Sequence, residues 1–307
     1  MKQRKEIKKL WLFITTSCNQ RCRYCFVKKT NEIISLKKAK QAIKTLILSP
    51  GKEKQLLLYG GEPLLYFALV RKIIVFAQSL AKENNKKLTI SLATNGTLIK
   101  KEHLNFFNRN NIKLAISIDG KKSTHDKFRV FKNGRGSFPK ISKNLQFVFE
   151  NLKEENFCAL MAVYPSEVKK MYENFIYLKE IGFKSVNIEP IQTVIWKEKQ
   201  KKDFLFQLNR ISNYILKEVN RKKFFFLNSV NRALKGKENP QENIEIHPSG
   251  KMSSSCFDFY PQIRFDEDII KLRDSASKEM AEFLKQRSRK NSIFGSYIKK
   301  AKSYIFE

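Results

Sequence analysis

Three cysteines close together are the residues of this chain best suited to chemistry. Cys18, Cys22 and Cys25 follow the spacing C-x3-C-x2-C. Three close thiolates can hold three irons of a cubane cluster and leave the fourth iron open to a small molecule. Zinc normally takes four protein donors, often from paired C-x2-C units, and no second such unit occurs in the sequence. The spacing therefore favours an iron–sulfur cluster, with zinc or reduced structural thiols as alternatives.

A glycine-rich run, Gly60-Gly61-Glu62-Pro63, follows further along the chain. Glycine allows the backbone to approach a ligand closely, so this loop could bond an amine while Glu62 supplies acceptor charge. Asn95 lies in a second turn-like run, ATNGT, and offers an amide side chain. Each run by itself is typical of an ordinary turn, so its significance depends on where the fold places it.

Three further polar side chains are candidate ligand contacts. Ser117 can donate a hydroxyl hydrogen bond, and the guanidinium fork of Arg129 suits a carboxylate. Asp119 lies between them and could equally cap the turn that follows it. Glu189 could reach a ligand or a substrate, or it could be a solvated strand end. His125 shares this stretch without an assigned chemistry.

Strand-like and helix-like runs alternate along the first 190 residues, which indicates a parallel sheet with helices outside it. The sheet could be an open doubly wound sheet or a partial barrel, and in both the ligand site lies at the carboxyl ends of the strands. Every motif above lies at or just after such an end. The predicted strands are 10–15, 55–59, 88–93, 113–118, 157–163 and 185–190, and the predicted helices are 36–48, 66–83, 100–109, 137–152 and 167–181.

The pattern changes after residue 190. Residues 197–223 are helical in pattern and very basic, 243–255 resemble a hairpin that turns at 248–250, and 278–304 are helical in pattern. We therefore expect two regions, a core at 1–191 and a C-terminal extension at 192–307.

The chain is strongly basic, with 61 Lys and Arg against 29 Asp and Glu and a formal net charge of +32. Such a balance attracts polyanions such as nucleic acid, but a general compositional drift towards lysine explains much of it. The apolar run near the N-terminus, LWLFI, is too short for an export signal, and we find no membrane-spanning run. The sequence thus predicts a cytoplasmic protein with no membrane partner.

Together the motifs resemble the radical S-adenosylmethionine (SAM) superfamily. The cysteine spacing followed by Phe26 is that of the superfamily, and GGEP matches a motif of it residue for residue. The runs TNG and SIDG…HDxxR are similar to those of the sulfatase-maturing and peptide-modifying subgroup, called SPASM-type. The resemblance implies an α/β fold, a partial (β/α)6 TIM-like barrel with a C-terminal helical and hairpin extension.

The resemblance also implies the cofactors and their ligands. Cys18, Cys22 and Cys25 would hold one four-iron–four-sulfur (4Fe-4S) cluster, and the amine and carboxylate of SAM would bind its open iron. By residue-for-residue carry-over, Ser117 and Arg129 would bind the SAM carboxylate. The remaining cofactor contacts implied are the GGEP loop (Gly60, Gly61, Glu62, Pro63), Asn95 and, at the adenine or ribose, Glu189.

The activity implied is reductive cleavage of SAM to a 5′-deoxyadenosyl radical, which abstracts hydrogen from a substrate. The subgroup favours a peptide or protein side chain or α-carbon as that substrate, and an electron donor such as flavodoxin or ferredoxin. Two alternatives are modification of RNA, suggested by the net charge, and a non-catalytic SAM-binding or iron–sulfur regulator.

The sequence departs from the subgroup in its C-terminal part. Relatives carry a cysteine-rich SPASM domain with further clusters, and residues 246–256 resemble its beginning, but no cysteine follows Cys256. We therefore expect a degenerate SPASM-like cap without an auxiliary cluster. Cys158 should be a buried small hydrophobe. Cys256 is either a relic or, as in some radical SAM epimerases, a donor that returns hydrogen to a peptide radical.

Overall fold

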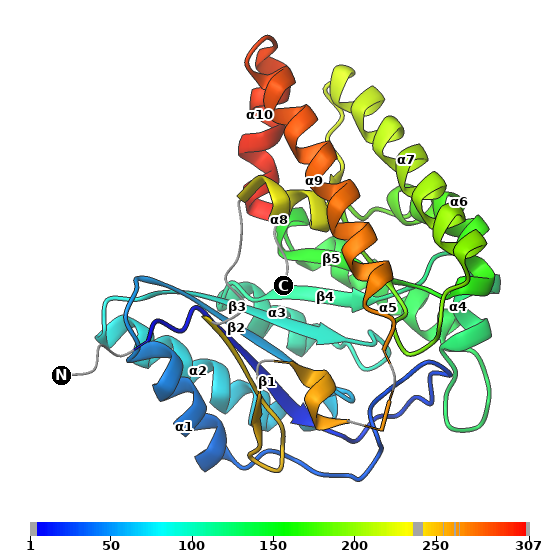
Figure 1. Cartoon of the computed structure of the whole chain (residues 1–307). Helices are drawn as coiled ribbons and strands as arrows, with labels where there is room; N and C mark the ends of the chain where they lie inside the picture. The colour runs from blue at the N-terminus through cyan, green and yellow to red at the C-terminus, as the bar shows by residue number, and fades with distance from the viewer. Residues whose placement is uncertain (1–4, 236–241, 254, 261, 264, 305–307) are drawn as a thin grey trace.

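The strands form one sheet in the computed structural model, which describes residues 5–235, 242–253, 255–260, 262–263 and 265–304. Within these residues nine strands pair in the order β7-β6-β5-β4-β3-β2-β1-β8-β9 (Figure 1). All neighbours are parallel except β8 and β9. The strands are β1 Lys9–Thr15, β2 Glu53–Gly60, β3 Lys87–Thr94, β4 Lys113–Ser117, β5 Phe157–Val163, β6 Ser185–Pro190, β7 Phe226–Leu227, β8 Asn243–Ile246 and β9 Met252–Ser253.

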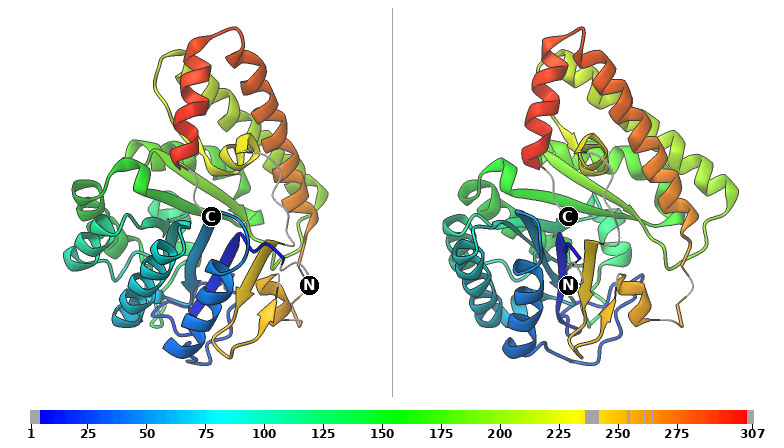
Figure 2. Two further views of the ribbon diagram at one scale, coloured as in Figure 1. Left: turned by 90° about the vertical axis from the view of Figure 1, so that its left-hand side faces the viewer. Right: turned by 60° about the vertical axis from the view of Figure 1, so that its left-hand side comes forward.

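Helices alternate with the first six strands, and four more follow in the extension. Figure 2 shows α7, α9 and α10 standing together, and α7 also contacts α6, one of the helices that cover the sheet. The first set is α1 Leu36–Ile47, α2 Phe67–Glu83, α3 Lys101–Arg109, α4 Lys122–Phe128, α5 Phe138–Asn151 and α6 Met171–Glu180. The second is α7 Glu198–Asn220, α8 Asn228–Lys235, α9 Asp268–Ser288 and α10 Ser292–Ala301.

The two faces of the sheet differ because side chains alternate along each strand. On β1, Leu10, Leu12 and Ile14 are fully buried in the main aliphatic core with residues of α1 and α2. The intervening Phe13 lies on the other face, where its ring is 4.9 Å from Tyr59. The helix-covered face therefore supplies the hydrophobic core, and the inner face is left to polar and aromatic side chains.

The predicted fold class is confirmed, with a mostly parallel α/β sheet that is not closed. All six predicted strands are present, but α4, β7 and α8 were not predicted because each is only two to eight residues long. The predicted helical character of 278–304 is confirmed, but the range is divided between two α-helices. The first helix, α9, begins at Asp268, and a break follows it in which Asn291 caps α10 by accepting from the Ile293 amide at 2.9 Å.

The extension adds strands to both edges of the sheet. β7 pairs with β6, and β8 pairs with β1. The predicted hairpin is present as β8 and β9. The division into regions at 191 and 192 stays a prediction, and the sheet runs continuously across it.

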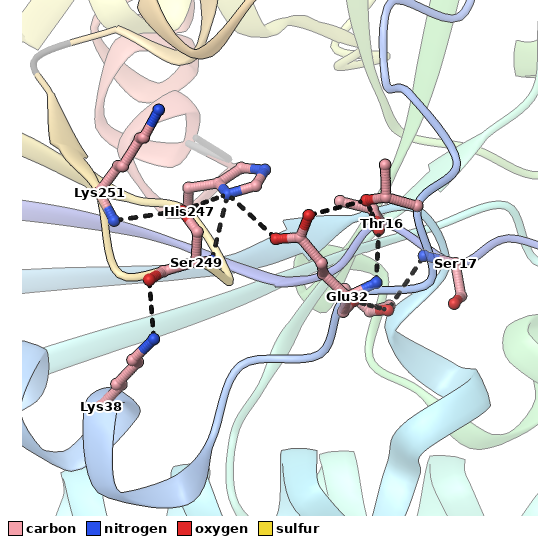
Figure 3. Close-up of polar contacts among 9 residues, drawn as sticks. Thr16, Ser17, Glu32, Lys38, His247, Ser249 and Lys251 are labelled. Carbon is pink, nitrogen blue, oxygen red and sulfur yellow. Dashed lines mark hydrogen bonds and ion pairs between the residues drawn. The ribbon is translucent and has the colours of Figure 1, made fainter.

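The hairpin is held against the segment that leads into α1 (Figure 3). Lys38 donates to the carbonyl of Ser249 at 2.7 Å. His247 Nδ1 lies 3.8 Å from a carboxylate oxygen of Glu32, and the Glu32 carbonyl accepts from the Thr16 amide at 3.0 Å. The turn of the extension is therefore tied, through Glu32, to the loop that carries the cysteines.

One segment, Pro63–Glu83, is long and apolar enough to cross a membrane by length and composition, which the sequence analysis had not recognised. Its helix α2 buries Val70, Ile73 and Ile74 in the core and contacts α1 and β3. Packing within the protein thus accounts for part of its apolar character, because 33% of the apolar window is buried.

Candidate functional site

A cavity of about 330 Å³ lies at the carboxyl ends of the strands. This is the position that a parallel α/β sheet favours for ligands, and the volume suits a small molecule. Most of the predicted site residues line it: Cys18, Cys22, Cys25, Gly60, Gly61, Asn95, Ser117, Arg129 and Glu189. Residues from the ends of five strands, β1, β2, β3, β4 and β6, thus meet in one place with Arg129, which follows α4.

The cysteine loop follows β1, and its thiols differ in exposure. Cys18 is buried, Cys22 is half-buried and Cys25 is exposed. Burial raises the pKa of Cys18, and it raises the pKa of Cys22 to about 12. Both free thiols are therefore protonated at neutral pH, and a metal must displace these protons to bind.

The arrangement fits a cluster better than a single metal ion. The three thiols line the same cavity. Three thiols are one donor fewer than the four that a structural zinc ion normally takes, whereas a cubane with one open iron takes three thiolates. The thiols accordingly suit a 4Fe-4S cluster.

The two glycines of the GGEP loop are required by a close approach of two loops. A Cβ atom on Gly61 would lie 2.0 Å from the carbonyl oxygen of Ser17, and Gly60 has φ +135°. The Gly61 amide donates to the Thr15 carbonyl at 2.6 Å. Any side chain here would push the GGEP loop away from the cysteine loop.

Glu62 and Pro63 were predicted as cofactor contacts, but neither residue lines the cavity. The buried Glu62 carboxylate accepts hydrogen bonds from Leu64 N at 3.0 Å, Thr94 Oγ1 at 2.8 Å and Asn95 N at 2.7 Å. Burial raises its pKa to about 7, while these three donors lower it. Glu62 therefore fixes the second and third loops to each other behind the cavity wall.

Asn95 joins the third loop to the cysteine loop. Its Nδ2 donates to Asn19 Oδ1 at 2.8 Å and approaches Cys18 Sγ at 3.7 Å. Its Oδ1 accepts from the Thr97 amide at 3.0 Å. Because both the Nδ2 and the Oδ1 atoms are hydrogen-bonded, the Asn95 side chain has a fixed orientation beside Cys18.

Arg129 is buried and paired with Asp119, which the sequence analysis had left open as a turn cap. Arg129 Nε donates to Asp119 Oδ2 at 2.9 Å, and Tyr24 donates to the same oxygen at 2.8 Å. Burial alone would lower the Arg129 pKa, but Asp119 raises it. Neither terminal nitrogen of Arg129 bonds to another of the described residues. The guanidinium is thus permanently charged, held from one side and open to an anion from the other.

His125 locks this pair in place. The Asp119 amide donates to His125 Nδ1 at 3.2 Å, so the ring proton must lie on Nε2. Nε2 then donates to Ser137 Oγ at 2.9 Å, and that hydroxyl donates to the Arg129 carbonyl at 2.9 Å. Burial lowers the His125 pKa to about 4, so the ring is neutral.

Ser117 and Glu189 close the far side of the cavity. Ser117 ends β4 and lines the wall. Glu189 accepts from Asn187 Nδ2 at 2.9 Å, forms an ion pair with the buried Arg273 of α9, and lies 3.8 Å from Arg232 of α8. The extension therefore places two arginines beside Glu189, which is one of the residues that line the cavity.

The remaining cysteines differ in how far the structure describes them. Cys158 is fully buried in β5 beside Ala115 of β4, which confirms the predicted small hydrophobe. Cys256 begins a short 3-10 turn, Cys256–Phe259, but its side chain lies outside the part of the chain that the structure describes. Both roles considered for it stay predictions.

Sequence reasoning missed Tyr24 and Arg273 as site residues. Tyr24 lies inside the cysteine motif, where an aromatic residue with a polar tip was a signal for a buried hydrogen bond. Arg273 had no local signal because its partner, Glu189, is 84 residues away in sequence.

Comparison with known proteins places the site in a family. The model of the radical SAM superfamily matches residues 12–188. A cysteine-type anaerobic sulfatase-maturating enzyme of Clostridium novyi is 32% identical over 173 residues, covering 52% of this chain and 46% of that enzyme. An uncharacterised protein of Methanocaldococcus jannaschii is 30% identical over 235 residues, covering 73% of this chain and 79% of its own length.

The fold agrees with solved structures as well. The structure of anSMEcpe with bound AdoMet and Cp18Cys peptide has a TM-score of 0.72 at 20% identity, covering 97% of this chain and 84% of that one. The matched part of this chain spans less than half the length of the Clostridium novyi enzyme.

Proposed function

Because the chain belongs to the radical SAM superfamily, a family of enzymes, we propose that it cleaves SAM reductively and abstracts hydrogen from a peptide or protein substrate. The observation that carries this proposal is the meeting of Cys18, Cys22 and Cys25 with Ser117 and Arg129 in one cavity. The superfamily uses SAM and a 4Fe-4S cluster, and both groups fit the residues present.

The three cysteines would hold one 4Fe-4S cluster, and one iron would remain for SAM. When bound, the cluster supplies the single electron that breaks a carbon–sulfur bond of SAM. Asn95 and the Gln20 amide, which donates to Cys18 Sγ at 3.4 Å, would orient that thiolate.

Arg129 and Ser117 would bind the carboxylate of SAM. Asp119 fixes the Nε side of Arg129, so the terminal nitrogens are presented in one orientation. The backbone of Gly60 and Gly61 would meet the SAM amine, because no side chain intervenes there. Glu189 would lie near the ribose, the adenine or the substrate.

A peptide or protein substrate is supported by two of the comparisons. The relative from Clostridium novyi is a sulfatase-maturating enzyme, and the structural neighbour was solved with a peptide. Glu189, which lines the cavity and is paired with Arg232 and Arg273, would suit such a polar chain. We expect a single cluster, since the extension lacks the cysteines for a second.

The test is anaerobic reconstitution followed by one-electron reduction with SAM present. About four irons per chain, as one cubane demands, and release of 5′-deoxyadenosine and methionine are expected. Replacing the three cysteines by Ala should abolish both, whereas Cys158→Ala is the matched control and should abolish neither. An iron content of about seven or more would indicate a second cubane and refute the single-cluster proposal.

Cys256 is tested separately, with a peptide that the wild-type enzyme modifies. A hydrogen donor at this position would deliver one solvent-derived deuterium to the product in deuterated water, because thiol protons exchange. Cys256→Ala would then still cleave SAM but leave the product incomplete. Normal product from this variant at the normal rate would end the donor hypothesis.

A further inference from the structure

Helix α2 leaves much of its apolar surface exposed. Only 33% of the apolar window within Pro63–Glu83 is buried. Val75 is 54% exposed and Leu65 is 41% exposed, although both are large hydrophobic residues. Packing against α1 and the sheet accounts for one face of α2, and the opposite face has no cover within the part of the chain that the structure describes. Exposed apolar surface of this kind is typical of an interaction site.

The exposed face borders a groove between α1 and α2, which lie side by side on the outside of the sheet (Figure 1). The groove has a volume of about 680 Å³, and it shares no lining residue with the cavity at the cysteines. Its apolar residues are Leu36 of α1 and Ala68, Val75 and Phe76 of α2. Residues 68–76 span two turns of α2, so the groove extends for about 12 Å along the helix.

Every charged residue that lines the groove is a cation: Lys40 of α1, and Arg71 and Lys72 of α2. Lys40 Nζ lies 4.9 Å from the centre of the Phe76 ring, so its chain covers part of the apolar floor. None of the three cations forms an ion pair with another described residue. Their charges are therefore available to a ligand.

Few carboxylates are present in the surrounding segments. Residues 26–47, 67–83 and 101–109 contain three in all. Each has a partner outside the lining of the groove: Glu32 with His247, Glu83 with Ser79, and Glu102 with Lys100. The charged groups at the groove are thus all positive, and its floor is apolar.

We propose that the groove between α1 and α2 binds an acidic amphipathic helix of a partner protein. Apolar side chains spaced three and four residues apart on that helix would contact Val75 and Phe76. Carboxylates beside them would pair with Lys40, Arg71 and Lys72. A groove between two packed helices has the shape that a third helix fills. The inference does not depend on the proposed function.

Charge and shape disfavour two other occupants. A second copy of this chain carries the same net charge of +32 and presents the same cations, so it would be repelled. An anionic membrane would attract the cations, but a helix that lies on a membrane buries a protruding apolar face. Here the apolar floor lies in a groove instead.

The probe is a synthetic peptide of about 16 residues with Leu along one helical face and Glu on both flanks, because shorter isolated helices are marginal in water. Fluorescence anisotropy measures its binding to the full chain. A peptide of the same composition in scrambled order keeps the charge and loses the apolar face. We expect the wild-type chain to bind the first peptide at least about tenfold more tightly than the scrambled one, which separates groove binding from general attraction to a basic protein.

The groove variant is Val75→Asp. Its control is Phe206→Asp, at a residue of α7 that is 61% exposed, which changes the net charge equally. Val75→Asp should weaken binding of the amphipathic peptide at least about tenfold, the scale of losing an important interface contact, whereas Phe206→Asp should leave the affinity unchanged. Lys72→Glu should weaken binding more than Lys82→Glu, which lies at the end of the same helix outside the groove.

Equal affinity of the wild type for the two peptides would overturn the proposal, and this comparison needs no variant to fold. So would an unchanged affinity of Val75→Asp, or an equal loss in Phe206→Asp. Vesicles that contain phosphatidylglycerol test the membrane. If they bind the wild type but not Val75→Asp, and the amphipathic peptide does not bind, the groove belongs to a membrane contact and the proposal is wrong. SAM cleavage should be the same in all these variants, because Val75 and Lys72 lie outside the cavity.

Discussion

The two walls of the cavity are built in different ways. The motif wall consists of the loops after β1, β2, β3 and β4, and its residues bond mainly to one another. Glu62 accepts from one donor of its own loop and from two donors at the end of β3 and just after it, and Asp119, Arg129 and His125 form one closed set. The opposite wall consists of Glu189 at the end of β6 and the residues directly after it, and Arg232 and Arg273 of the extension support this wall by pairing with Glu189.

The difference teaches where precision is needed. A cofactor that the superfamily shares requires fixed geometry, and buried, mutually satisfied polar groups provide it. A substrate that varies among relatives is better met by segments from far along the chain, such as α8 and α9, which can change without disturbing the loops. Four predictions test this contrast, in order of decreasing effect.

Arg129→Ala should weaken SAM binding by about 2–4 kcal/mol, the usual cost of losing one partner of a buried charge pair. Calorimetry under anaerobic conditions on the cluster-loaded protein measures it, and iron content verifies that the cluster remains. Arg135→Ala, an exposed residue of the same segment, is the control and should bind SAM normally. Equal affinities for both variants would remove Arg129 from the site.

His125 should make the motif wall sensitive to acid. Its folded pKa of about 4 lies below its usual 6.5, so between these values only the unfolded chain takes up the proton. Stability is then complete above pH 6.5 and falls as the pH drops, by up to about 3 kcal/mol at pH 4. Urea unfolding of the cluster-free protein at several pH values measures this.

Because His103 and His247 also have lowered pKa values, the comparison needs a variant. His125→Gln should be less stable at pH 7.5 but should lose less stability on acidification than the wild type. If both proteins lose the same stability on acidification, His125 is not the group that titrates.

At about pH 8, where Glu62 with its pKa of about 7 is mostly ionised, Glu62→Gln should lower the free energy of unfolding by about 1.5–3 kcal/mol, the range for hydrogen bonds to a charged group. The Gln amide keeps one acceptor oxygen, but its NH2 group faces a hydrogen-bond donor that a carboxylate oxygen of Glu62 accepts from in the wild type. Glu53→Gln, at an exposed position of β2, is the control and should have little effect. A stability equal to that of the control would mean that Glu62 does not hold the loops together.

Lys38→Met should have the smallest effect, about 0.5–1.5 kcal/mol, because it removes one hydrogen bond at the surface. The loss should be local, and hydrogen exchange should speed up in β8 and β9 but not in β1 to β4. Faster exchange across the whole sheet would show that the hairpin does not open separately from the strands that carry the motif wall.

The sequence alone determined the parts of the protein that depend on neighbours in the chain. Short apolar runs identified the six parallel strands, because the strands of a covered parallel sheet are buried on both faces, and apolar residues three and four apart identified the helices. The residues of the cavity were identifiable because a parallel sheet brings its strand ends, and hence the loops after them, to one edge.

Only the tertiary structure decided what each of these residues touches. No local pattern shows that Gly61 packs against the Ser17 carbonyl, that Glu62 turns away from the cavity, or that Arg273 reaches Glu189. Gly61 and Ser17 are 44 positions apart in the sequence, Glu62 is 2 to 33 positions from its donors, and Arg273 is 84 positions from Glu189. A side chain bonds to whatever the packed core brings within about 3 Å of it, and sequence spacing does not carry that distance.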